Sequence, residues 1–74
     1  MEYTELKTEL ENMGYKWMPR LDKWSHKNLA TIWYDSDDDS IGCVDTNNEY
    51  NIWNVPLFCV SKHSLYILIG KVTR

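Results

Sequence analysis

Long apolar stretches, glycine-rich loops and a basic leader are all missing from this 74-residue chain. No segment approaches the roughly 18 uninterrupted apolar residues that a membrane-spanning helix needs, and the acidic start, Met1-Glu2, lacks the basic region of a signal peptide. The glycines, at positions 14, 42 and 70, stand too far apart to form a loop that cradles phosphate. We therefore expect a soluble, cytoplasmic protein with no membrane partner.

The signatures of catalysis are also absent. Cys59 and His63 are the one pair that resembles a nucleophile with its base, and no Asp or Asn at a telling spacing orients the histidine. A domain of this length buries only a small core, which leaves little room for a substrate cleft. The sequence thus predicts a protein that is not an enzyme.

Basic residues are missing from the middle of the chain. Positions 28–61 contain no Lys or Arg, and the net charge of the whole chain is −3. The acids in this stretch are Asp35, Asp37, Asp38, Asp39, Asp45 and Glu49. An acidic surface repels phosphate and attracts basic groups. The pattern argues against direct nucleic-acid binding and favours a basic protein partner.

The periodicity of the apolar residues predicts a single α+β domain. Leu6, Leu10 and Met13 recur at helical spacing, so we expect a helix from Tyr3 to Met13 that is capped by Gly14. From position 29 the period changes to two, which predicts strands at 29–34, 41–45 and 50–53. Polar turns at 35–40 and 46–49 join them, and turns this short favour an antiparallel meander.

The predicted architecture is an N-terminal helix packed on an antiparallel sheet of three to four strands. Residues 15–19 alternate briefly in the manner of a strand. We expect Trp33, Val44 and Ile52 to line the face that the helix covers. The C-terminal segment fits a helix with an apolar face from Leu65 to Val72, and it also fits a strand; the helix is favoured.

The two cysteines and two histidines make up a complete set of zinc ligands. His26, Cys43, Cys59 and His63 would form a tetrahedral Cys2His2 site, which would be structural because no coordination position stays open. Only Cys59-x-x-x-His63 is a close pair. The alternative is that both cysteines are buried as small apolar residues while both histidines lie at the surface. Both interpretations stay open, so the predicted cofactor is one structural zinc ion or none.

The acid run Asp35-Ser-Asp-Asp-Asp-Ser begins like a calcium loop, but Ser40 replaces the required glycine and Thr46 the bidentate glutamate. It is interpreted instead as a hairpin turn or as an acidic loop that binds a partner, through Asp35, Asp37, Asp38 and Asp39. Trp17, Arg20 and Trp24 combine aromatic and basic character. They are candidate anchors of a protein interface, or else the tryptophans fill the core.

A helix followed by Gly14-Tyr15-Lys16-Trp17, and then by aromatic strands with Asn- and Asp-rich turns, resembles small accessory proteins of phages and prophages of Gram-positive bacteria. Among these, the acidic chain is similar to anti-CRISPR proteins that act on type II systems. The resemblance implies stoichiometric, non-enzymatic binding to guide-loaded Cas9, which blocks target DNA binding or activation. The alternatives are a phage regulatory or adaptor protein that binds another host protein, or a weak nucleic-acid-binding module.

Overall fold

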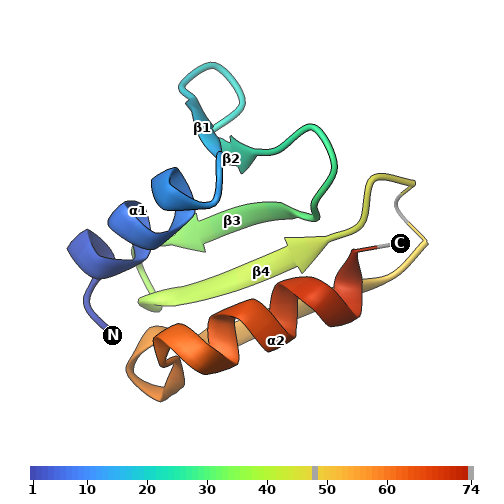
Figure 1. Ribbon diagram of the computed structural model, residues 1–74. Helices are drawn as coiled ribbons and strands as arrows, with labels where there is room; N and C mark the ends of the chain where they lie inside the picture. The colour runs from blue at the N-terminus through green and yellow to red at the C-terminus, as the bar shows by residue number, and fades with distance from the viewer. Residues whose placement is uncertain (48, 74) are drawn as a thin grey trace.

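The computed structural model describes residues 1–47 and 49–73 (Figure 1). The elements follow one another as α1 (Tyr3–Asn12), β1 (Lys16–Met18), β2 (Lys23–Ser25), β3 (Thr31–Asp35), β4 (Ser40–Val44), β5 (Asn51–Pro56), the 3-10 turn η1 (Leu57–Cys59) and α2 (Lys62–Val72). Each strand pairs antiparallel with the next, in the order β1-β2-β3-β4-β5. The predicted α+β fold is confirmed. The sheet has five strands rather than three to four: β1 lies within the strand-like stretch 15–19, and β2, which pairs with it, was not predicted because its three residues show no clear period.

Helix α1 forms where the apolar stripe predicted it. Leu6 and Leu10 lie one turn apart and are buried, while the Glu5 carboxylate accepts a hydrogen bond from the Glu2 amide at the N-terminus. Gly14 ends the helix with φ of +96°, a conformation that favours glycine. In this geometry the Tyr15 amide donates to the Leu10 carbonyl at 2.9 Å, which closes the helix end.

The C-terminal segment is helical, which confirms the favoured prediction. Ser61 caps α2, since its hydroxyl accepts a hydrogen bond from the Ser64 amide at 3.1 Å. The buried face of the helix consists of Leu65, Ile69 and Val72. Their spacing of four and then three residues keeps all three on one side, and α2 contacts the sheet at β4.

Both helices pack on the same face of the sheet. Cross-strand pairing places Trp24 beside Ile32, Ile32 beside Cys43, and Cys43 beside Ile52. Trp24, Ile32 and Cys43 are buried together with Leu6 and Leu10 of α1 and with the apolar face of α2. This row of side chains is the centre of the core.

The predicted assignment of residues to the covered face was wrong for two of three positions. Ile52 does lie in the covered row, whereas Trp33 pairs with Gly42 and therefore points to the opposite face, as does Val44. The error arose because β3 carries large apolar side chains on both of its faces, with Ile32 and Tyr34 on one and Trp33 on the other. Alternation alone therefore did not reveal which face meets the helices.

A bulge in β5 shapes the uncovered face. Ile41 pairs with Val55 and Cys43 pairs with Ile52, so β5 has one more residue than β4 between these two pairs. Asn54 takes up the extra residue with φ of +59°. The Trp53 indole then lies directly against Gly42, in the space that a side chain on β4 would otherwise occupy.

Replacing Gly42 by alanine should lower the free energy of unfolding by about 1–3 kcal/mol, because the new methyl group would overlap the Trp53 ring. Gly70 is the matched control, since a methyl group added at that helical position would meet no neighbouring atom within 4 Å. Gly70→Ala should therefore raise the free energy of unfolding by about 0.5–1 kcal/mol. Urea titration measures both changes, and destabilisation of equal size in the two variants would contradict this account of Gly42.

Candidate functional site: an acidic groove on the uncovered sheet face

A groove of about 380 Å³ opens on the sheet face that the helices leave uncovered. It runs between the β3–β4 turn and the bulge of β5. We call it the acidic groove and define it by Asp22, Trp33, Asp35, Asp37, Gly42 and Trp53. Its described lining also includes uncharged residues, and it contains three carboxylates and two indoles but no Lys or Arg.

Two tryptophans supply the aromatic surface of the acidic groove. Trp33 lies on β3 opposite Gly42. Trp53 belongs to β5, its indole packs over Gly42, and half of its surface (50%) is exposed. The absent side chain at Gly42 is what leaves room for the second indole. Trp33 is partly buried, so Trp53 supplies most of the accessible aromatic surface, and an exposed aromatic in a hollow is typical of binding surfaces.

Turn geometry and hydrogen bonds hold the acids of the groove and the neighbouring Asp39. The Asp35 carboxylate accepts a hydrogen bond from the Asp37 amide at 2.9 Å, which fixes the start of the β3–β4 turn. Asp39 sits in the left-handed region with φ of +50° and accepts a hydrogen bond from the Tyr34 hydroxyl at 2.6 Å. That hydrogen bond raises the pKa of Tyr34 to about 12. Asp22 reaches the same groove from the β1–β2 turn.

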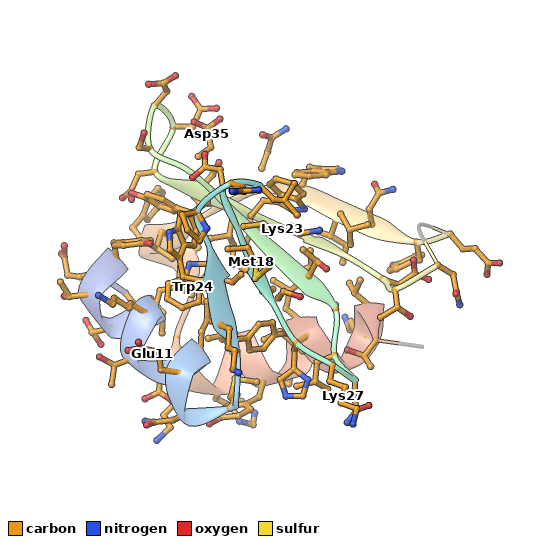
Figure 2. The ribbon with its side chains drawn as sticks, turned by 90° about the horizontal axis from the view of Figure 1, so that it is seen from above. Glu11, Met18, Lys23, Trp24, Lys27 and Asp35 are labelled. Carbon is orange, nitrogen blue, oxygen red and sulfur yellow. The ribbon has the colours of Figure 1, made fainter. Side chains whose placement is uncertain are left out.

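A cation of the chain itself already lies beside this aromatic surface. The Lys23 ammonium is 5.6 Å from the centre of the Trp33 ring, within the range of a cation–π interaction. Seen from above, Lys23 of β2 and Met18 of β1 lie side by side, and Asp35 lies at the end of β3 (Figure 2). The groove therefore combines the two groups, indole faces and carboxylates, that bind guanidinium and ammonium ions.

Of the four acids predicted to bind a partner, two line the acidic groove and two lie outside it. Asp35 and Asp37 line the acidic groove. Asp38 and Asp39 are exposed on the same turn, and Asp39 is engaged with Tyr34. The interpretation of the acid run as a hairpin turn is confirmed by the pairing of β3 with β4, and its role in binding a partner stays a prediction.

The predicted aromatic anchors need correction. Trp24 is only 2% exposed and belongs to the core, which is the alternative that residue type alone left open for the tryptophans. Trp17 is partly exposed and its ring centre lies 5.4 Å from that of Trp24, while Arg20 is exposed in the β1–β2 turn. Sequence reasoning missed Trp33 and Trp53 as site residues. The isolated Gly42 in a strand was the available signal, since such a glycine marks close approach by another group.

The four predicted zinc ligands are not gathered into one site. Both ring nitrogens of His26 are already engaged: one contacts the Met13 carbonyl at 2.9 Å, and the other accepts from the Asn28 and Leu29 amides at 2.9 and 3.2 Å. Cys43 is buried, whereas Cys59 and His63 are exposed. Among residues 1–47 and 49–73, no three His, Cys, Asp or Glu side chains are grouped so that they could hold a metal ion.

Zinc binding stays a prediction, and it has a direct test. A structural zinc ion requires one metal per chain by elemental analysis and a lower melting temperature after chelation, because metal-binding free energy adds to folding free energy. Metal-free protein that melts at the same temperature with and without a chelator would remove the zinc hypothesis.

The two thiols should differ sharply in reactivity. Burial raises the pKa of the Cys43 thiol to about 12, so this group stays protonated and unreactive at mildly alkaline pH. Cys59 is exposed. In dilute native protein a thiol reagent should modify one cysteine quickly and the second only after unfolding, as followed by mass spectrometry. Cys59→Ser should abolish the fast reaction; equal rates for both thiols would show that Cys43 is accessible.

Comparison with protein-family models, curated proteins and solved structures finds no match to this chain. Within the described residues, neither helix has the length and apolar character needed to cross a membrane.

Proposed function

We propose that this chain is a stoichiometric, non-enzymatic binding protein whose acidic groove receives an arginine side chain from a basic protein. One observation carries the proposal: Trp33 and Trp53 share a single groove with Asp22, Asp35 and Asp37, and no Lys or Arg of the described chain lines it. The groove thus presents negative charge and aromatic faces together on the open side of the sheet.

Arginine fits this combination better than lysine does. The guanidinium is planar, so it stacks on an indole while its N–H groups donate to a carboxylate. A lysine ammonium is a compact charge that meets only one of these groups well. The position of Lys23 over Trp33 supports the cation-binding character of the indole face, since a lysine of the chain already uses it.

A protein partner is favoured over a nucleic acid because of charge. The chain has a net charge of −3, and the three carboxylates of the groove would repel phosphates. The resemblance to type II anti-CRISPR proteins supports guide-loaded Cas9 as the partner, a large basic nuclease whose charged channels complement an acidic ligand. Binding there would block target DNA binding or activation without any chemical step.

Reversing one charge in the groove should weaken binding to guide-loaded Cas9 by about tenfold or more. Asp37→Lys tests this, because Asp37 lines the groove and, of its atoms, only the backbone amide makes a hydrogen bond within residues 1–47 and 49–73. Glu11→Lys, an exposed position near the end of α1, is the matched control with the same change in net charge. Trp53→Ala should weaken binding as Asp37→Lys does. Calorimetry or interferometry measures the affinities.

The same proteins should be compared in DNA cleavage, with the chain added before or after target DNA. Inhibition only when it is added first would place the block at target binding, and inhibition in both orders would place it at cleavage. No binding and no inhibition would exclude Cas9 as the partner. If Asp37→Lys and Glu11→Lys bound Cas9 with equal affinity, the acidic groove would be excluded as the binding site. Tight binding of this chain to DNA itself at physiological salt would contradict the proposal as a whole.

A further inference from the structure

Ser40 is a buried polar residue within the acidic groove. It begins β4, and it pairs with Asp35 of β3 on one side and with Pro56 of β5 on the other. Because side chains alternate along a strand, positions 40 and 42 face the same, uncovered side of the sheet. Ser40 lines the acidic groove, although only 4% of its surface is exposed. Its side chain therefore lies at the bottom of the groove.

The hydroxyl of Ser40 is not used by the fold. Its cross-strand neighbour Asp35 accepts from the Asp37 amide, and no group within residues 1–47 and 49–73 hydrogen-bonds to the Ser40 hydroxyl. The described side-chain atoms that are both fully covered and without a partner belong to Trp24 and Asp45, so the Ser40 oxygen keeps some accessible surface. Buried polar groups normally have hydrogen-bond partners. This hydroxyl is therefore available to a ligand in the groove.

Indoles beside carboxylates suit two kinds of cation, which differ in their N–H groups. A methylated ammonium binds to aromatic faces and carries no hydrogen-bond donor once it is fully methylated. A guanidinium also stacks on an indole, and its five N–H groups can donate to a carboxylate and to a hydroxyl oxygen at the same time. Asp35 stands directly opposite Ser40, and the Trp53 indole packs over Gly42 on the same strand. The unpaired hydroxyl among these groups favours the cation that has donors.

We propose that Ser40 determines the specificity of the acidic groove: its hydroxyl oxygen accepts a hydrogen bond from the guanidinium of the bound arginine, which selects arginine over a fully methylated cation of the same charge. The inference rests on the proposed function, because it concerns the same groove. A site that holds a buried hydrogen-bonding group discriminates against a ligand that leaves this group unpaired. Charge and aromatic surface alone would not separate the two cations.

Titration with two small probes tests the role of Ser40. Nα-acetyl-arginine amide and Nα-acetyl-trimethyl-lysine amide carry the same charge, and the indole N–H signals in NMR spectra report the binding of each. Ser40→Ala should raise the dissociation constant of the arginine probe by about tenfold and leave that of the trimethyl-lysine probe unchanged. Ser25→Ala is the matched control, since it removes a hydroxyl from β2 on the same side of the sheet but outside the groove. Both constants should then stay at their wild-type values.

Thermal melting followed by circular dichroism separates this role from a structural one. Because the hydroxyl has no partner in the fold, Ser40→Ala should melt at the wild-type temperature or above it. If the wild-type chain and Ser40→Ala bind the arginine probe equally well, the role of Ser40 is overturned while the proposed function stands. Wild-type protein that binds trimethyl-lysine more tightly than arginine would also overturn it. No saturable binding of the arginine probe to the wild-type chain would contradict the arginine-receiving groove itself.

Discussion

The burial of one sheet face under both helices is the constraint on which the rest of the structure depends. Trp24, Ile32 and Cys43 form a continuous row across three strands, and the apolar stripes of α1 and α2 cover that row. The described part of this 74-residue chain has only two α-helices with which to cover a five-stranded sheet. Because both helices cover the same face of the sheet, the opposite face must meet solvent or a partner.

The uncovered face owes its shape to two local departures from regular strand structure. Gly42 removes a side chain from β4, and the bulge at Asn54 turns Trp53 toward the space that results. The tight β3–β4 turn then places Asp35 and Asp37 at the end of the same hollow. Aromatic surface and negative charge are thereby joined in one groove, although the residues come from separate strands and turns. Such a groove suits a planar cation better than an anion or a purely apolar ligand.

Much of the fold was predictable from local pattern. The stripe of Leu6 and Leu10 predicted α1, Gly14 marked its end, and the acid run between positions 35 and 40 marked the β3–β4 turn. β1 lies within the stretch 15–19 that alternates in the manner of a strand, whereas β2 was missed because a strand of three residues is too short to show a period. The anchors were assigned by residue type alone, and burial then separated Trp24 from the exposed tryptophans, since a large aromatic serves a core as well as an interface.

By itself the sequence determined most of the helices and strands and their order, because apolar stripes, caps and turns depend on residues close together in the chain. It also determined that positions 28–61 contain no basic residue. Only the tertiary structure decided which side of each strand meets the helices, and hence that Trp33 and Trp53 share a groove while Trp24 is buried. It also decided that His26 contacts the end of α1 and, within the described residues, joins no metal-binding group with the cysteines. These outcomes depend on pairing between residues distant in the chain, where a shift of one position moves a side chain from the core to the open face.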